Sequence, residues 1–241
     1  MVDETRIDEE KKWRYQKLAR MTVANFRKRR ISAEYVPTGH EALSKVLGLI
    51  PRDATVAWGD SITLHQVGLI SELKKSKQRL IFDPFEMNAD GSLAATGEER
   101  LTIMRKAMTA DFFLSSVNAV TIDGKLVSTD ATGNRVAAVV FGPKKVIIIA
   151  GANKIVKNID EALRRIKEVV APINAKRHLS KHNFQRIADL PCIKKGICLD
   201  CFHPERLCRY TVIIEGERNP GGMNSYIPRI YVILVGEELG I

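Results

Sequence analysis

The segment KKVIIIAGA, from Lys144 to Ala152, decides how this chain folds. Its apolar residues are consecutive rather than alternating, and a short run of this kind is typical of a strand buried on both faces of a sheet. Similar apolar runs occur at 55–58, 79–82 and 229–234, and helical patterns separate several of them. This alternation predicts an α/β fold in which helices cover both faces of a mostly parallel sheet.

The other elements follow from periodicity. Helices are expected where apolar residues recur at three- and four-residue spacing, at 9–30, 40–49, 63–73, 98–110 and 159–171. Short β-type runs are expected at 32–36, 112–117, 119–122, 125–128, 136–141 and 210–215. Residues 1–241 are expected to form one domain, with an N-terminal helical segment at 1–50 and a cysteine-rich loop at 190–210.

Composition indicates a globular protein with a basic surface. The 241 residues are 45% hydrophobic and 27% charged, and the formal net charge is +10. No apolar run reaches the roughly 20 residues that cross a membrane, and the N-terminus has no apolar signal core, so we expect a cytoplasmic protein without membrane contact. The basic residues near the N-terminus interleave with apolar ones, as on a solvated helix face. Nucleic acid is therefore not an expected partner, whereas a small carboxylate or phosphorylated ligand is.

All the cysteines lie in one stretch near the C-terminus, with the spacing C-x5-C-x2-C-x6-C: Cys192, Cys198, Cys201 and Cys208. Four thiolates can hold a [4Fe–4S] cluster or a zinc ion. We expect the cluster, because nearby cations can offset its negative charge: Lys194, Lys195, Arg206 and Arg209. A structural zinc is the alternative, although zinc sites usually have two close cysteine pairs. Disulfides or free thiols are the third interpretation. His203 is left out of the ligand set, since a lone histidine in a polar loop is usually solvated.

Three polar loops follow predicted strands, where parallel α/β sheets bind ligands. The loop 59–63 offers a glycine and a helix N-terminus to an anion, or caps a helix. The loop 130–135 presents Arg135, a carboxylate or phosphate clamp or else an exposed cation in a turn. The loop 83–86 carries two carboxylates, which act either in acid–base catalysis or as part of a turn and a helix cap.

Several common catalytic motifs are missing. The chain has no dinucleotide-binding fingerprint, P-loop, nucleophile elbow or zinc-protease motif, and 151–154 resembles a phosphate loop only faintly. These absences argue against a standard dehydrogenase, kinase, serine hydrolase or zinc protease.

Two strings resemble the LUD (lactate-utilisation) domain family: VAWGDSITLHQVGLI at 56–70 and SSVNAVTIDGKLVSTDATGNRVAAVVFGPKKVIIIAGANKIV at 115–156. The likeness runs from about residue 12 to residue 235 and is greatest to stand-alone members related to the C subunit of the lactate-utilisation system. It implies an open three-layer α/β/α sandwich, similar to sugar-phosphate isomerases and CoA transferases, that binds small anions. Carried over by position, with Asp60 added from the first loop, the expected binding residues are Gly59, Asp60, Ser61, Thr63, Asn118, Thr121, Asp130, Gly133, Asn134 and Arg135.

The cysteine loop departs from the C-type pattern and suggests that this protein carries its own redox centre. The resemblance implies a role near the oxidation of lactate, in which partner subunits carry iron–sulfur clusters. Together with the cysteine loop it predicts an iron–sulfur redox component of lactate or related 2-hydroxy acid utilisation, hence an oxidoreductase component, with Arg135 holding the carboxylate. One alternative is a non-redox ligand-binding or group-transfer protein with a structural zinc loop. Another is an interaction subunit that docks on larger iron–sulfur or flavin redox subunits. No catalytic residue and no oligomeric state are assigned.

Overall fold

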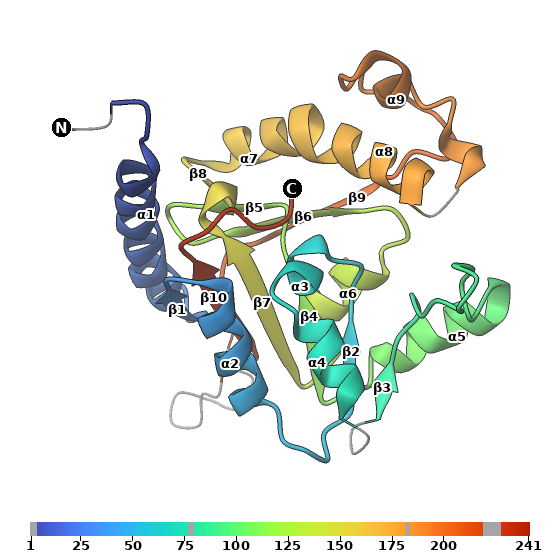
Figure 1. The fold of residues 1–241 in the computed structure, drawn as a ribbon, viewed down its shortest axis with the longest axis horizontal. Coiled ribbons are helices and arrows are strands. Elements are labelled where there is room, and N and C mark those ends of the chain that lie inside the picture. Colours follow the sequence, from blue (N-terminus) through green and yellow to red (C-terminus); the bar gives the residue numbers. More distant parts are fainter. Residues whose placement is uncertain (1–3, 77–79, 182–183, 219–227) are drawn as a thin grey trace.

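The computed structural model describes residues 4–76, 80–181, 184–218 and 228–241 and arranges their strands in two sheets (Figure 1). Within these residues the larger sheet has six parallel strands in the order β1-β10-β7-β4-β2-β3. Its strands are β1 (Ser32–Val36), β2 (Val56–Trp58), β3 (Ile81–Phe82), β4 (Phe112–Ser115), β7 (Lys145–Gly151) and β10 (Ile230–Val235). The apolar run after Lys145 is therefore an inner strand, paired with β10 on one side and β4 on the other.

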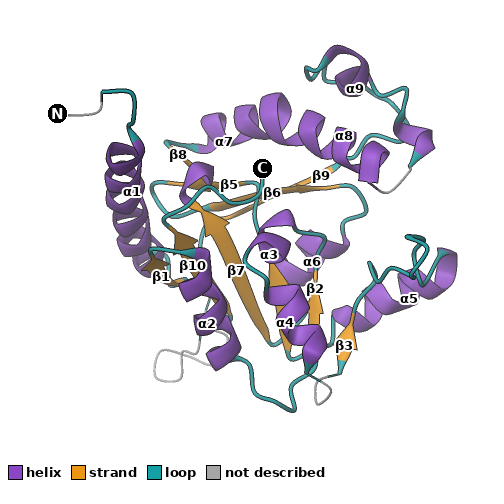
Figure 2. Ribbon diagram, in the orientation of Figure 1, coloured by secondary structure: helices purple, strands orange, loops and turns teal. Residues whose placement is uncertain are grey.

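Side chains along β7 point alternately to the two faces of this sheet and enter two separate hydrophobic clusters. Val146 and Ile148 pack with one group of helices, and Ile147 and Ile149 pack with the other. The first group is α1 (Asp8–Lys28), α5 (Gly97–Ala107) and α6 (Asn134–Val140), and the second is α2 (Gly39–Leu49), α3 (Ile62–Gln66) and α4 (Leu69–Lys75). Helices on both faces give three layers (Figure 2), which confirms the expected fold class.

A smaller mixed sheet lies beside the carboxyl end of β7 (Figure 1). In the described chain its strands, in the order β8-β5-β6-β9, are β5 (Ala119–Thr121), β6 (Leu126–Asp130), β8 (Ile155–Val156) and β9 (Tyr210–Ile214). The helix α7 (Ile159–Arg165) packs on it through Ala162. One π-helical turn, Ile166–Val170, joins α7 to α8 (Ala171–Lys181). Asp123 and Gly124 lie in the turn of the β5–β6 hairpin; the sequence predicted strands here but not this separate sheet.

Three predicted elements differ from the structure. The run 136–141 is not a strand but α6, whose first N–H groups, at Arg135 and Val136, donate to the Asp130 carboxylate. This cap and the packing of α6 against α5 outweigh the β-propensity of its valines. The helix predicted at 63–73 is broken at Gly68, whose φ is 76°. The helix predicted at 159–171 continues to Lys181, and the predicted strand residue 79 lies outside the described residues.

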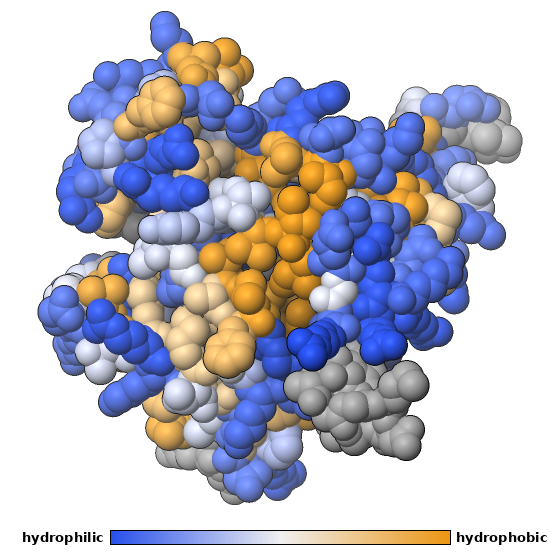
Figure 3. Space-filling view, turned by 180° about the vertical axis from the view of Figure 1, so that it is seen from behind, coloured by the Kyte–Doolittle hydropathy of each residue, from blue (hydrophilic) through white to orange (hydrophobic). Residues whose placement is uncertain are grey.

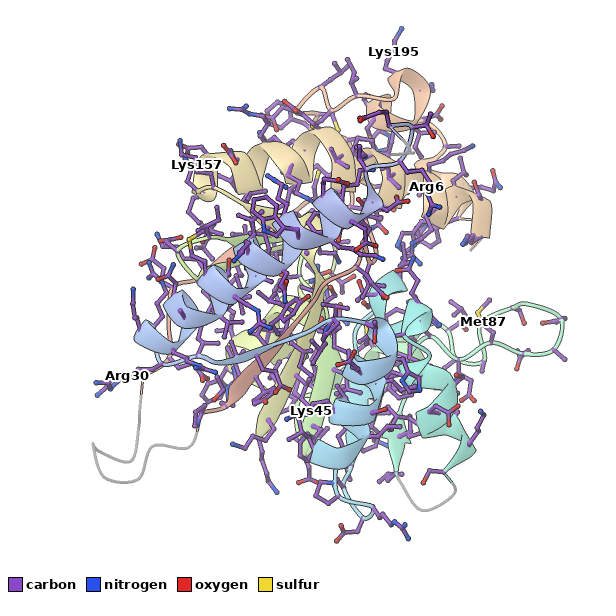
Figure 4. The ribbon with its side chains drawn as sticks, turned by 60° about the vertical axis from the view of Figure 1, so that its left-hand side comes forward. Arg6, Arg30, Lys45, Met87, Lys157 and Lys195 are labelled. Carbon is purple, nitrogen blue, oxygen red and sulfur yellow. The ribbon has the colours of Figure 1, made fainter. Side chains whose placement is uncertain are left out.

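The excess positive charge lies largely on the outside. Figure 4 shows Arg30, Lys157 and Lys195 at the outer edge of the molecule. Apolar side chains gather in a band on the back of the molecule (Figure 3). Within the described ranges, no helix is long and apolar enough to cross a membrane.

Two alanine substitutions separate backbone strain from steric clash. Gly124 and Gly91 both have positive φ, 87° and 81°; a Cβ on Gly124 would lie 2.7 Å from the Phe26 backbone nitrogen, whereas one on Gly91 meets nothing within 4 Å. We expect Gly91→Ala to lower the free energy of unfolding by about 1 kcal/mol, the usual penalty for a left-handed residue with a Cβ. Gly124→Ala should lower it by at least about 2 kcal/mol, because the hairpin must also move away from α1. Urea denaturation measures the free energy of unfolding of both variants. Equal losses would show that α1 moves away from the added Cβ at little cost.

Candidate functional site

A cavity of about 270 Å³ lies where β2, β4 and β7 end, below α7 and α8. Its walls come from the loops that follow these strands, the loop after β6, the π-helical turn 166–170 with α8, and the chain around Gly240. The volume is at the lower end for binding pockets, which suits a ligand of a few carbon atoms. The cavity is not an apolar void, because many polar side chains line it: Asp60, Ser61, Thr63, Arg100, Ser116, Asn118, Asp130, Asn134, Arg135, Lys154, Arg177 and His178.

Arg135 holds two of the surrounding loops together. Its Nη1 donates to the Ser116 carbonyl oxygen at 3.2 Å, and its Nη2 donates to the Thr129 carbonyl at 2.7 Å and to Asn118 Oδ1 at 3.4 Å. Burial lowers the pKa of Arg135, opposed by the charges of Asp130 and Asp60. Among the described residues nothing accepts from its Nε, so the guanidinium retains donor capacity toward the cavity.

Gly59 makes this position of Arg135 sterically possible. A Cβ on Gly59 would lie 2.8 Å from the Arg135 Cδ atom. The Arg135 side chain therefore packs against Gly59, and Gly59 itself does not line the cavity.

Lys154 is the most unusual ionisable group of the site. It follows β7 in the short 3-10 helix Ala152–Lys154, and its side chain is 4% exposed. Its Nζ donates to Thr63 Oγ1 at 3.0 Å and to Ser116 Oγ at 2.9 Å. Burial lowers the pKa of Lys154 to about 7, and the charges of Arg165 and Arg135 act in the same direction. The amine is thus close to half neutral at physiological pH.

The chain after β10 packs closely over this lysine. Gly240 has a φ of 70°, and a Cβ there would lie 2.5 Å from Thr63 Oγ1 and 2.8 Å from Lys154 Nζ. The Gly240 N–H donates to Gln66 Oε1, and the Leu239 N–H donates to Asn153 Oδ1. These bonds fix one wall of the cavity directly against the Lys154 amine.

An ion pair joins the loop after β2 to α8 across the cavity. Both oxygens of Asp60 accept from the Arg177 guanidinium, and His178 Nε2 lies 3.4 Å from Asp60 Oδ2. The side chains of Asp60 and Arg177 are only 18% and 12% exposed. Asp60 therefore holds α8 in place and is already engaged by a cation.

The structure brings most of the sequence-predicted binding residues to this cavity. Those that line it are Asp60, Ser61, Thr63, Asn118, Asp130, Asn134 and Arg135. Gly59, Thr121 and Gly133 do not. Thr121 bonds Asp123 inside the β5–β6 turn, and Gly133, with a φ of 90°, precedes α6. Ser61 accepts from the Leu64 N–H, as the capping alternative predicted.

In the loop 83–86, which carries two carboxylates, Asp83 serves a structural role. Asp83 accepts from Trp58 Nε1 at 3.1 Å and from the Phe85 N–H at 2.9 Å, and it pairs with Lys74 at 2.6 Å. These bonds match the turn part of the turn-and-cap interpretation, but the cap part is wrong, because the next described helix, α5, begins only at Gly97. Only Phe85 of this loop reaches the cavity.

Sequence reasoning did not place Lys154, Ser116 or Arg177 among the binding residues. For Lys154 a signal existed, because it lies at the carboxyl end of the most apolar strand, where parallel sheets bind ligands. For Arg177 there was none, since its role depends on α8 lying over the loop after β2.

The cysteines lie at the edge of the same cavity. The segment that carries them follows the 3-10 turn Gln185–Ile187 and contains the short helix α9 (Pro191–Lys195). Cys208 and Leu207 line the cavity, and Cys192 and Leu207 pack against the small apolar cluster of Ala175, Ile187 and Leu190. The pocket and the cysteine loop, separate in the sequence, are neighbours in the fold.

The four thiols are near one another but do not form a ligand cage. Burial and then the charges of Cys201 and Cys208 raise the pKa of Cys192, and burial also raises the pKa of Cys208. The Asp200 N–H donates to Cys198 Sγ at 3.4 Å. Across the part of the chain that the structure describes, no group of three or more His, Cys, Asp or Glu side chains is arranged to hold a metal ion. The expected metal site therefore stays a prediction.

The Lys154 environment predicts a specific pH dependence of stability. Its pKa is about 7 in the folded protein, against roughly 10.4 in an unfolded chain. Above pH 7 the unfolded chain then binds more protons at this residue than the folded protein does, so stability must rise with pH. Relative to Lys154→Met, the wild type should gain about 1.4 kcal/mol of unfolding free energy per pH unit between about pH 7 and about pH 10. Urea denaturation of both proteins across this range tests the expectation. Parallel profiles would contradict it.

Comparison with known proteins places the chain in a family. The LUD domain family matches residues 19–187, which leaves the cysteine segment outside the matched region. A DUF162 family protein from Deinococcus radiodurans is similar in structure, with a TM-score of 0.48 and 10% identity over 92% of this chain and 97% of that chain. Ribose 5-phosphate isomerase A from Neisseria gonorrhoeae aligns with a TM-score of 0.31 and 12% identity over 50% and 54%. The eIF2B delta protein from Chaetomium thermophilum aligns with a TM-score of 0.30 and 16% identity over 52% and 50%.

Comparison with curated proteins finds no match. The family match nonetheless covers well over half of the chain and includes most of the segments that line the cavity. This protein belongs to the LUD domain family, a lactate-utilisation-related domain.

Proposed function

We propose that this LUD-domain protein binds a small carboxylate of the lactate type in the cavity and that its cysteine segment holds a [4Fe–4S] cluster beside it. The observation that carries the proposal is that residues of both kinds line one cavity: Arg135 and Lys154 line one part of it, and Cys208 lines another. A redox centre held by the cysteine segment would then lie next to the bound acid, within a short electron-transfer distance.

The charges around the cavity support an anionic ligand. Asp60 is engaged by Arg177, and Asp130 accepts backbone N–H groups at the start of α6. Arg135 and Lys154, by contrast, bond only to neutral oxygens among the described residues. Neutral acceptors satisfy hydrogen bonds but do not cancel charge, so an incoming carboxylate gains from both cations.

The chemistry of the donor set supports a thiolate-bound centre. Four cysteines occur between residues 192 and 208, and the Cys198–Cys201 turn places Asp200 at a φ of 49°, with its N–H on Cys198 Sγ. The N–H group that faces this sulfur would stabilise a thiolate there. A rearrangement of the loop would have to gather the four sulfurs, and the metal itself would supply the driving force.

A structural zinc is the second candidate, and one observation favours it. Cys192 and Leu207 belong to a small apolar cluster with Ile187 and Leu190, distinct from the larger clusters around the main sheet. A small apolar cluster of this size is commonly reinforced by a metal. In this case the cysteine segment stabilises the protein and takes no part in redox chemistry.

Metal analysis of protein purified without oxygen decides between these two. We expect iron and acid-labile sulfide in the wild type, with visible absorption, and loss of both in Cys201→Ser because three thiolates hold a cluster poorly. Ser115→Ala removes a buried hydroxyl on β4 that, among the described residues, donates to the carbonyl of its neighbour Ser116, and it serves as a control that should keep the metal. Colourless protein with one zinc would reject the cluster and support the structural alternative.

Lactate binding tests the carboxylate site independently of the metal. Arg135→Lys keeps the charge but loses the fork of donors, so we expect at least a tenfold weaker affinity by calorimetry, about 1.4 kcal/mol. Arg105→Lys is the matched control, because Arg105 is 71% exposed on α5 and should leave binding unchanged. Equal affinity of the wild type and Arg135→Lys would show that the carboxylate does not bind at Arg135.

A further inference from the structure

We propose that Lys154 is a nucleophile that forms a Schiff base with the carbonyl carbon of a small oxo acid bound in the cavity. The inference rests on the carboxylate-binding function proposed above and names the class of ligand that this site would take. It assigns to Lys154 a covalent step that ligand binding alone does not require.

The position of the amine supports this role. Lys154 lines the cavity although its side chain is only 4% exposed, so its Nζ faces the enclosed space and not bulk water. The Thr63 and Ser116 hydroxyls, at 3.0 and 2.9 Å, hold the Nζ atom on two sides. The contact of Gly240 restricts it further. An amine fixed in this way is already oriented when a carbonyl group arrives.

The charge environment keeps the nitrogen lone pair available. A lysine becomes a useful nucleophile when it is desolvated or when other cations lie near it, because both conditions favour the neutral amine. Lys154 has both: it is buried, and the charges of Arg165 and Arg135 act on it. Its described hydrogen-bond partners are hydroxyls and not carboxylates, so none of them stabilises the ammonium form by ion pairing.

The proposed step balances without an oxidant or a reductant. The neutral Nζ attacks the carbonyl carbon, a C–N bond forms, and the carbonyl π electrons move to oxygen. A proton passes from nitrogen to that oxygen, and the Thr63 and Ser116 hydroxyls, which touch Nζ, can relay it. A second proton comes from solvent as the C–O bond breaks. One water molecule leaves, and a protonated imine remains on Lys154.

The same cavity explains why the ligand should carry a carboxylate beside its carbonyl. Arg135 retains donors that no described residue occupies, and it lies near enough to Lys154 to influence its charge. A carboxylate held by Arg135 would therefore bring an adjacent carbonyl carbon toward Nζ. The cavity of about 270 Å³ restricts the acid to a few carbon atoms.

Reductive trapping tests the proposal on the full-length protein. The protein is incubated with pyruvate and sodium cyanoborohydride and then analysed by intact mass and peptide mapping. We expect one added group, equal to the mass of pyruvate less one oxygen atom, on Lys154. Lactate has no carbonyl group, so it should give no adduct but should compete with trapping.

Two variants locate the reaction. Lys154→Arg keeps a cation in place and should lose trapping entirely. Lys145→Arg is the matched control, because Lys145 is a half-buried lysine at the other end of β7, bonded to the Pro228 carbonyl, and trapping should persist. Peptide mapping of the wild type gives the site of labelling even if Lys154→Arg folds poorly.

The outcomes separate this inference from the function on which it rests. If calorimetry shows that pyruvate and lactate bind but no adduct forms on Lys154, the Schiff base is rejected and the carboxylate site stands. If neither acid binds, both are rejected. Adducts spread over surface lysines, or retained in Lys154→Arg, also overturn the proposal.

Discussion

The rest of the structure depends on the burial of β7 on both of its faces. Every residue from Val146 to Gly151 is buried, and alternate side chains enter the two main hydrophobic clusters. At about 25 cal/mol for each Å² of apolar surface removed from water, such a strand strongly favours this arrangement. It also directs the chain straight from the core into the cavity. Lys154, three residues after the strand ends, is consequently almost completely removed from water.

A second constraint is the concentration of positive charge beside this strand end. Arg135 and Arg165 lie close enough to Lys154 for their charges to lower its pKa, and burial lowers the pKa of all three residues. The protein satisfies their hydrogen bonds mainly with neutral oxygens; Arg165, for example, donates to the Asn118 carbonyl at 2.8 Å. This arrangement favours the neutral form of Lys154 or the binding of an anion. A single ligand can make use of both. An oxo acid supplies the anion for the arginine and the carbonyl for the amine.

The cysteine segment extends the family domain at the side where the cavity opens toward α8. It lies outside the matched residues 19–187, yet it contributes Cys208 to the cavity and Cys192 to the apolar cluster near the end of α8. The Asp60–Arg177 ion pair fixes α8 over the loop after β2. Any movement of the cysteine segment on metal binding would therefore act on the cavity wall. In this way a metal centre and a ligand site could influence each other.

The amino-acid sequence by itself determined the α/β class, the positions of most strands and the family. Seven of the ten residues that it predicted for ligand binding line the cavity. These features depend on local patterns: consecutive apolar residues in strands, helical spacing, and loops that follow strands. Only the tertiary structure decided that 134–140 is a helix, that Lys154 faces Thr63 and Ser116, and that Cys208 borders the cavity. Each of these depends on contacts between segments far apart in the chain, such as Thr63 and Lys154, which are 91 positions apart. No local pattern encodes such contacts, because the burial that shifts the lysine pKa exists only after the layers have packed.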